Sequence, residues 1–238
     1  MSHETRAPAP IRHVIWDWNG TLLDDAHACV AALNRMLRRR GMAEIDHASY
    51  REVFDFPVRD YYCRLGFDFA TEDWDANARE FIEYYSEACR DASLREGALA
   101  VLTRLHERGI PMSVLSAAET SLLRRMLEDH GVRGFFRAIY GLSDPYAHTK
   151  VARGRALMSE LGLPPERVLL VGDTTHDYRV SREIGCRCVL ISGGHQAEHR
   201  LRKCGCPVVS GLPRLEAVLN QMTGDSSRPR VPSAERRG

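Results

Sequence analysis

Acidic side chains follow two apolar runs that lie far apart in the chain. Asp17 ends the run 14–16 and opens the segment Asp17-Trp18-Asn19-Gly20-Thr21. The run 168–171 leads into Gly172-Asp173-Thr174-Thr175-His176-Asp177. Buried strands that end in carboxylate-bearing turns bring acidic groups together at the carboxyl edge of a parallel sheet, where open α/β folds bind ligands. The pattern predicts a divalent-metal site beside a nucleophilic aspartate.

A carboxylate that attacks phosphorus or carbon needs a cation nearby, because two negative groups repel each other. Mg²⁺ suits this position, since it binds carboxylate, substrate and water oxygens. We expect Asp17 and Asp173 to supply two of its ligands. Gly20 and Thr21 are expected to belong to the phosphate-binding part of the site. Gly20 would let the chain turn sharply and expose backbone N–H groups, and Thr21 would steady the turn with its hydroxyl group.

Two further stretches suit a phosphoryl site. Ser116 follows the apolar run 111–115, so its hydroxyl and the N–H of Ala117 are expected at the same sheet edge as Asp17, where they can bind phosphate oxygens. Lys150, one of two lysines in the chain, stands just ahead of a helical pattern. Its ammonium is expected to neutralise both the nucleophile and the incoming phosphate.

The elements that position these residues alternate along the chain. The strand-like apolar runs are 14–16, 111–115, 138–140, 168–171, 189–191 and 208–209, and the helical patterns between them are 98–108, 121–129, 151–161 and 212–222. This alternation predicts an α/β fold with a doubly wound parallel sheet. We assign residues 11–24 and 95–223 to this core, and expect residues 1–10 and 224–238 to be disordered because they lack periodic apolar residues.

The segment 25–94 interrupts the alternation. It carries helical patterns at residues 26–40, 47–54, 58–65 and 72–92, and no convincing strand. A helical insert just after the first strand predicts a cap over the sheet edge, which would shut water and wrong substrates out of the site. Its aromatic residues are expected to pack helices together rather than to line a pocket: Tyr61, Tyr62, Trp74, Phe81, Tyr84 and Tyr85.

Composition indicates an ordinary globular protein that can bury a sizeable core, with 238 residues, 44% hydrophobic and 27% charged. The net charge of +1 gives no electrostatic reason to expect nucleic acid as a partner. No apolar stretch approaches the roughly 20 residues that cross a bilayer, and the N-terminus has no apolar signal core. We therefore expect a cytoplasmic monomer or homodimer. The Cys-x-Cys spacing of its cysteines favours reduced thiols over a zinc site.

In this order the four stretches resemble the motifs of the haloacid dehalogenase superfamily, and the resemblance covers approximately residues 12–215. The insert is similar to the helical cap of phosphoglycolate phosphatase-like members. The resemblance implies that Asp17 is a nucleophile that forms an aspartyl-phosphate, and that Asp173 and the backbone carbonyl of Asn19 bind Mg²⁺. It further implies that Asp177 supports the metal shell, that Ser116 holds the phosphate, and that Lys150 pairs with Asp17.

Asn19 departs from the superfamily pattern. In the phosphatases of the superfamily this position is a second aspartate, which protonates the leaving oxygen and then activates water. An amide does not shuttle protons near neutral pH, and general acid–base help is worth about 10² to 10⁴ in rate. Three explanations stay open: a substrate with a good leaving group, such as an acyl phosphate, aryl phosphate or phosphoanhydride; a different proton donor; or a weak, regulatory or chemically different protein.

The candidate proton donors are Asp24, His27, His148 and His176. Asp24 and Asp25 stand where a helix should begin, so capping of that helix is at least as good an interpretation. The histidines are equally well interpreted as surface or hydrogen-bonded residues.

The leading hypothesis is a Mg²⁺-dependent phosphohydrolase of a small phosphorylated metabolite. The first alternative is a non-catalytic binding or regulatory protein, which Asn19 alone supports. Dehalogenases and phosphonoacetaldehyde hydrolase also lack an aspartate at this position. However, the former need no metal, whereas acidic residues are present here, and the latter needs a cap lysine, which residues 25–94 lack. Substrate choice would be set by the cap and by the loop bearing Asp144, Pro145, Tyr146 and His148. Arg59 or Arg64 could grip a carboxylate or a second phosphate, although solvated helix faces are the better interpretation of these arginines. The loop Gly193-Gly194-His195-Gln196 could approach the site, although glycine there more often only turns the chain.

Overall fold

The computed structural model describes residues 9–142 and 149–223. The expectation of disorder at the two chain ends falls almost entirely on residues outside this range, as does the loop that bears Asp144, Pro145, Tyr146 and His148.

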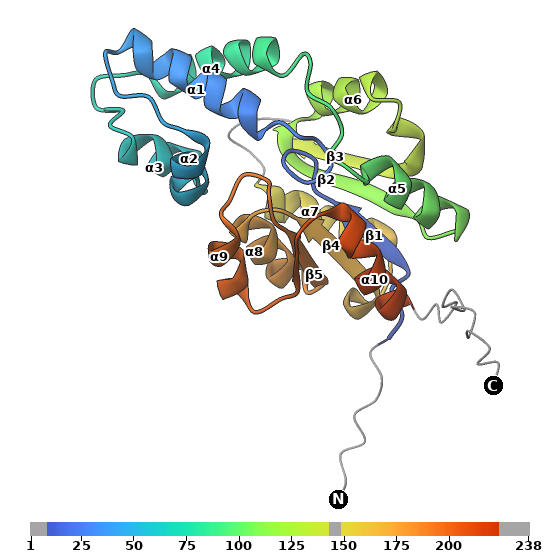
Figure 1. The fold of residues 1–238 in the computed structure, drawn as a ribbon. Helices are drawn as coiled ribbons and strands as arrows, with labels where there is room; N and C mark the ends of the chain where they lie inside the picture. The colour runs from blue at the N-terminus through green and yellow to red at the C-terminus, as the bar shows by residue number, and fades with distance from the viewer. Residues whose placement is uncertain (1–8, 143–148, 224–238) are drawn as a thin grey trace, which may run out of the picture.

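Parallel strands form one sheet in the order β3-β2-β1-β4-β5-β6 (Figure 1). The strands are β1 (His13–Trp16), β2 (Met112–Glu119), β3 (Phe136–Leu142), β4 (Val168–Gly172), β5 (Arg187–Ile191) and β6 (Val208–Val209). Every predicted apolar run forms a strand. Strand β2 continues past its apolar run to Glu119, with an irregular register against β3 between Leu115 and Glu119.

Helices cover both faces of the sheet. Side chains alternate along β1, so Val14 and Trp16 pack on one face and Ile15 on the other. The first face is covered by α5 (Ala98–Glu107), α6 (Thr120–Asp129) and α10 (Leu212–Thr223), and the second by α7 (Lys150–Leu161), α8 (Thr175–Ile184) and α9 (Glu198–Leu201). The predicted doubly wound α/β fold is confirmed. Helices α8 and α9 are elements that the sequence patterns did not predict.

The helices α1 (Ala26–Arg39), α2 (His47–Val53), α3 (Val58–Arg64) and α4 (Trp74–Ala88) follow one another between β1 and α5, and no strand is assigned between them. In Figure 1 they lie together beyond the carboxyl edge of the sheet. Helix α4 is shorter at both ends than the predicted 72–92. Its start is set by the Asp73 side chain, which accepts a hydrogen bond from the N–H of Ala76 and so caps the first turn, and it ends at Ala88. These helices have a hydrophobic core of their own, which includes Leu33, Tyr50 and Tyr62.

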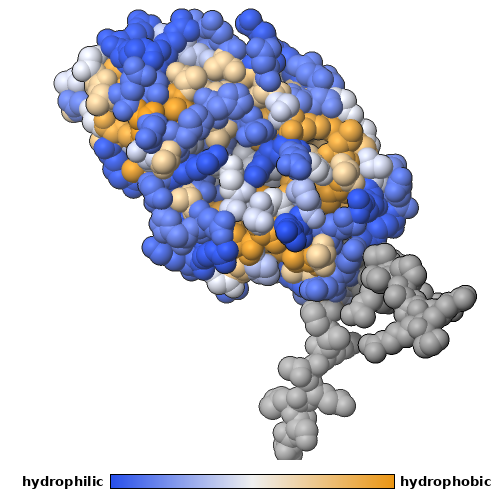
Figure 2. All heavy atoms as spheres, viewed as in Figure 1, coloured by the Kyte–Doolittle hydropathy of each residue, from blue (hydrophilic) through white to orange (hydrophobic). Residues whose placement is uncertain are grey.

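The face of the molecule drawn in Figure 2 is mostly polar. Apolar residues gather on it in smaller patches over both the helical insert and the sheet domain. Within the described residues, no helix has the length and apolar character needed to cross a membrane. All seven cysteines are free thiols.

Candidate active site

A buried lysine lies between two carboxylates at the carboxyl edge of the sheet. Asp17 follows β1, Lys150 begins α7, and Asp177 lies in the first turn of α8. Lys150 Nζ donates to Asp177 Oδ1 at 2.6 Å and pairs with the carboxylate of Asp17. Burial alone would lower the pKa of Lys150, but the two carboxylates outweigh it and raise the pKa. The ammonium is therefore charged at neutral pH.

Asp173 completes a set of three buried carboxylates. Thr21 Oγ1 lies 3.0 Å from Asp17 Oδ2 and 3.1 Å from Asp173 Oδ1, so its hydroxyl connects the loop after β1 to the end of β4. Carboxylate oxygens of Asp17, Asp173 and Asp177 all lie within 4.8 Å of one another. One lysine does not neutralise three carboxylates. Burial accordingly raises the pKa of Asp17 and of Asp173.

The donor chemistry of this cluster fits a hard divalent cation, because carboxylate oxygens are its preferred protein ligands and the cluster carries excess negative charge. Asp17 and Asp173 are the residues that would hold it. Both carboxylate oxygens of Asp177 already accept hydrogen bonds from the protein. Oδ1 accepts from Lys150, and Oδ2 accepts from the N–H and the hydroxyl of Thr174 at 3.0 and 2.6 Å. This capping box opens α8 and fixes the Asp177 carboxylate beside the cluster. The predicted ligand role of these residues and of the Asn19 carbonyl stays a prediction.

In the turn after Asp17, Gly20 makes the sharp turn that was expected, and both Gly20 and Thr21 hydrogen-bond to carboxylates of the protein. Gly20 adopts a φ of 72°, in the left-handed region that favours glycine. Its N–H donates to Asp25 Oδ1 at 2.7 Å. This N–H is therefore not free to bind phosphate, although the sequence had suggested that role. Thr21 is likewise occupied by Asp17 and Asp173. Both residues position the carboxylates instead.

Ser116 and Ala117 lie at the sheet edge beside Asp17 and line the same cavity. Ser116 Oγ accepts from the N–H of Ala118 at 3.0 Å and lies 3.4 Å from Asn19 Oδ1, a long hydrogen bond. Ser116 lies within β2 and not after it, because the strand continues to Glu119. Its predicted role in holding phosphate remains compatible with this position.

Asn19 is held by a buried polar network. Its Nδ2 donates to Asp25 Oδ2 and lies at hydrogen-bond distance from the hydroxyl of Tyr85, both at 2.8 Å. The Tyr85 hydroxyl donates to the same Asp25 oxygen at 2.7 Å. Asp25 was expected to cap α1, but its side chain makes no capping hydrogen bond and turns inward to these groups. Because both amide protons face Asp25 and Tyr85, the orientation of the Asn19 side chain is fixed.

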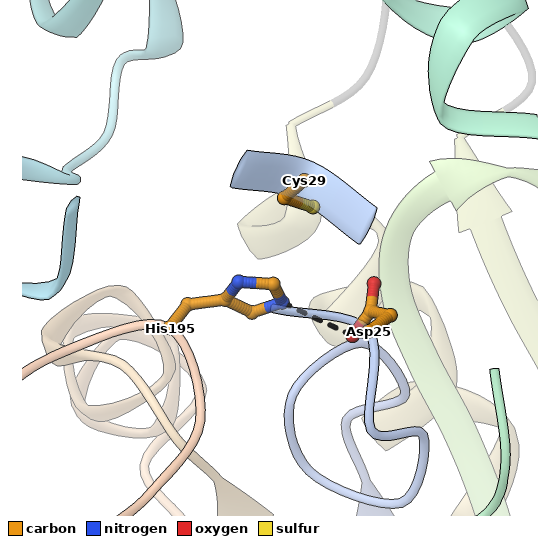
Figure 3. Close-up of side chains that lie close together, drawn as sticks. All are labelled: Asp25, Cys29 and His195. Carbon is orange, nitrogen blue, oxygen red and sulfur yellow. Dashed lines mark ion pairs between the residues drawn. The ribbon is translucent and has the colours of Figure 1, made fainter. Parts of the chain in front are cut away.

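His195 lies against the other side of Asp25, as Figure 3 shows together with Cys29. His195 Nε2 lies 3.3 Å from Asp25 Oδ1, and Nδ1 lies 2.9 Å from the hydroxyl of Tyr50. Burial alone would lower the pKa of His195, but the Asp25 carboxylate outweighs it and raises the pKa to about 9. The backbone N–H of His195 also donates to Asp173 Oδ2 at 2.6 Å. The loop therefore reaches the site, and sequence reasoning had assigned no role to the Asp25–His195 pair.

The predicted proton donors fare differently. Asp24 and His27 are exposed and do not line the cavity, so the structure gives them no access to a leaving group. His148 lies outside the described residues. His176 lines the cavity and stacks on Phe56 with ring centroids 4.4 Å apart. Burial lowers the pKa of His176 to about 4, so its imidazole is uncharged near neutral pH and is a poor proton donor to a leaving group.

A cavity of about 540 Å³ lies over Asp17, between the sheet edge and the helices α1 to α4. Aromatic residues of the insert both pack in its core, as predicted, and line this cavity, which the prediction had rejected: Tyr61, Tyr62, Phe81 and Tyr85. Arg59 and Arg64 are not among the cavity-lining residues. The charged cluster thus opens into a largely apolar chamber.

The fold and the site together define a class of protein: an α/β protein with a doubly wound parallel sheet that carries a nucleophile-like aspartate, a buried lysine and an acidic cluster at one sheet edge. Residues 14–191 match the haloacid dehalogenase-like hydrolase family, and the chain belongs to that family. The resemblance inferred from the motifs is confirmed, and the chain is an enzyme of the hydrolase class.

Individual relatives agree with this assignment. The chain is 29% identical to a phosphoglycolate phosphatase of Rhodospirillum rubrum, over 78% of this chain and 81% of that protein. It is 26% identical to a phosphoglycolate phosphatase of Synechococcus elongatus, over 82% of this chain and 89% of that protein. The crystal structure of a predicted phosphatase from Clostridium acetobutylicum superposes with a TM-score of 0.73 at 21% identity, covering 89% of this chain and all of that chain. The last comparison supports the fold alone.

Proposed function

We propose that the protein is a Mg²⁺-dependent phosphohydrolase that acts on a small phosphorylated metabolite through an aspartyl-phosphate on Asp17. The observation that carries the proposal is the buried cluster of Asp17, Lys150, Asp173 and Asp177, which opens into the cavity between the sheet edge and the insert. The similarity to phosphoglycolate phosphatases supports a phosphate ester as the substrate.

The residues of this chain would share the first step as follows. A carboxylate oxygen of Asp17 attacks phosphorus while Lys150 keeps that carboxylate and the phosphoryl oxygens partly neutralised. Ser116 and the N–H of Ala117 hold the phosphoryl oxygens at the end of β2. A bound Mg²⁺, held by Asp17 and Asp173, would offset the charge that builds up on the transferring group.

Asn19 governs how the two steps compare in rate. Its amide protons are donated to Asp25 and Tyr85, so it does not protonate a leaving group or activate water. A reactive leaving group removes the need for help in the first step. Hydrolysis of the aspartyl-phosphate still needs an activated water, so this second step is expected to limit turnover and to produce a burst of the first product.

The test is phosphate release from a broad panel of monoesters, acyl phosphates and nucleotides, with Mg²⁺ and with excess EDTA. Turnover is expected with Mg²⁺ only and should vanish in Asp17→Asn. Asp24→Asn is the matched control, because Asp24 is an exposed carboxylate near the same turn that does not line the cavity. A panel without phosphate release, or equal turnover by wild type and Asp17→Asn, would overturn the proposal.

A further inference from the structure

The wall of the cavity that faces Asp17 from the insert is apolar. Helices α1 to α4 and the segments between them contribute mainly aliphatic and aromatic side chains: Leu33, Tyr50, Phe54, Phe56, Val58, Tyr61, Tyr62, Phe81, Ile82 and Tyr85. Among the described residues of the insert that line the cavity, none is a lysine, an arginine or a histidine. An anionic group on the far end of a substrate would therefore meet no cation from the insert.

Of the basic side chains on the other walls, Lys150 and His195 already have close polar partners, His176 stacks on Phe56, and Arg125 is exposed to solvent. Lys150 pairs with Asp17 and Asp177, and both ring nitrogens of His195 face the partners Asp25 and Tyr50. Arg125 is exposed on α6, where its charge lies near the Glu119 carboxylate. The cavity thus has cationic chemistry for a phosphoryl group next to Asp17, but an apolar chamber beyond it.

The volume of the cavity also favours a large apolar leaving group. A cavity of about 540 Å³ falls within the roughly 300–1,000 Å³ of pockets that enclose ligands of drug-like size. A leaving group of two or three polar atoms would leave most of this chamber unfilled. A ring system would fill it and bury apolar area against Phe56, Tyr61 and Phe81.

The fixed amide of Asn19 is an independent observation on the same substrate. With no proton donor at this position, a leaving oxygen that is stable as an anion is favoured, and phenols ionise near pH 10 (about the value for tyrosine), well below alkyl alcohols. We propose that the enzyme hydrolyses phosphate monoesters of apolar phenols, with the ring held in the chamber formed by the insert. This inference rests on the proposed phosphohydrolase function.

The reaction balances without a further reactant. A carboxylate oxygen of Asp17 forms a bond to phosphorus, and the bond between phosphorus and the aryl oxygen breaks with its electron pair on that oxygen. The phenolate takes up a proton from water. A second water attacks phosphorus in the aspartyl-phosphate, which releases inorganic phosphate and regenerates the Asp17 carboxylate.

One exposed side chain supports an apolar ligand. Ile82 and Leu99 are the large hydrophobic side chains that stand exposed in the described part of the chain, at 49% and 53% of their surface. Ile82 lies on α4 and lines the cavity, whereas Leu99 lies on α5 and does not. Ile82 is thus an apolar residue placed where a bound ring would cover it, and Leu99 provides a matched control.

The experiment compares kcat/KM for 2-naphthyl phosphate, phenyl phosphate and phosphoglycolate with Mg²⁺. Naphthol and phenol leave with similar ease, so the ratio of kcat/KM for their two esters reports only how well the chamber binds the ring. We expect kcat/KM for 2-naphthyl phosphate to be at least about tenfold higher than for phenyl phosphate. Phosphoglycolate is expected to be the poorest of the three. Ile82→Arg should lower kcat/KM for 2-naphthyl phosphate about tenfold or more and reduce its advantage over phosphoglycolate. Leu99→Arg should change neither value.

The outcomes separate the two proposals. If phosphoglycolate is turned over as well as 2-naphthyl phosphate, the aromatic substrate is wrong and the phosphohydrolase stands. If no ester releases phosphate, the proposed function fails. Calorimetry of each ester with Asp17→Asn then tests, independently of turnover, whether the chamber prefers an aromatic ring. We expect 2-naphthyl phosphate to bind at least about tenfold more tightly than the other two esters. Equal affinities for all three esters would overturn the inference.

Discussion

The contact between Asn19 and Asp25 permits a quantitative test by exchange of the two side chains. In the native protein the Asn19 amide donates to Asp25 Oδ2 at 2.8 Å inside a buried network. Asn19→Asp places a second carboxylate against the first. Asp25→Asn removes the acceptor that faces Asn19, Tyr85 and His195. The double variant Asn19→Asp/Asp25→Asn restores an amide that donates to a carboxylate, with the two ends reversed.

The magnitude follows from the separation. Two charged carboxyl groups whose centres lie about 4 Å apart repel by about 4 kcal/mol at an effective dielectric constant near 20. If the pair escapes by binding a proton, the same energy corresponds to a pKa raised by about three units. We therefore expect Asn19→Asp to lower the free energy of unfolding by about 4 kcal/mol at pH 8, where both carboxyl groups are ionised. The exchange should recover most of this loss, with a coupling energy of about 2–3 kcal/mol.

The assay is urea unfolding of the wild type, the two single variants and the double variant at pH 8. The slope of the free energy against urea should stay constant, so that midpoints report stability alone. Two results would refute the reasoning: a single variant Asn19→Asp as stable as the wild type at pH 8, or single-variant losses that simply add in the double variant. Either would mean that the Asn19 and Asp25 side chains do not share this contact.

The exchange also tests the role of the missing acid. In the double variant the new carboxylate at position 19 lines the cavity together with Asp17, and general acid–base help is worth about 10² to 10⁴ in rate. We expect a gain of that order on alkyl phosphates and a much smaller one on aryl phosphates, which need less protonation. An equal gain on both classes would contradict the account of Asn19.

Three further predictions concern stability and metal binding. His13 is buried against Ser113, and burial, followed by the charge of Arg137, lowers its pKa to about 4. The folded state therefore resists protonation, so stability is complete above the unfolded pKa of about 6.5 and falls by about 3 kcal/mol as the pH drops to 4. The urea midpoint of His13→Gln should therefore fall less than that of the wild type between pH 7.5 and 4, because the contribution of His13 to the pH dependence is absent. An unchanged slope would contradict the buried neutral imidazole. Mg²⁺ at a hundredfold excess over its Kd should stabilise the protein by about 2.7 kcal/mol, and Asp173→Asn should abolish this shift in thermal unfolding. A shift that survives in Asp173→Asn would place the cation elsewhere. Gly194→Ala should cost about 1–3 kcal/mol, because its Cβ would overlap the Asp173 carboxylate. Gly134→Ala, whose Cβ meets nothing within 4 Å, is the control and should be neutral, so equal effects of the two would refute the clash.

Most of the fold followed from local patterns. Apolar runs such as 168–171 predict buried strands, and the carboxylate after each run marks the strand end, so Asp17 and Asp173 were expected at one edge. Helix α8 was not predicted although it follows directly from the second motif. The start of this helix is set by the capping box of Thr174 and Asp177, residues that were interpreted only as site chemistry.

The pairing of Asp25 with His195 depends on tertiary structure that no local pattern contains. Asp25 stands after the first motif, where a helix cap is the usual interpretation, and His195 lies in a glycine-containing loop far along the chain. Only the placement of β5 next to β4 brings that loop to the first turn. The same holds for the chamber, because helical spacing places aromatic residues in a core but does not reveal which of them also face a cavity.

The central claim is that Asp17 accepts the phosphoryl group. The most direct test is to quench the enzyme in acid during turnover of 2-naphthyl phosphate with Mg²⁺ and to locate the phosphoryl group by mass spectrometry of the digested protein. The account predicts a phosphorylated peptide that contains Asp17, in an amount matching the burst of naphthol, because Asn19 leaves the second step slow. A phosphoryl group on another residue, or turnover with no covalent phosphoenzyme, would contradict it.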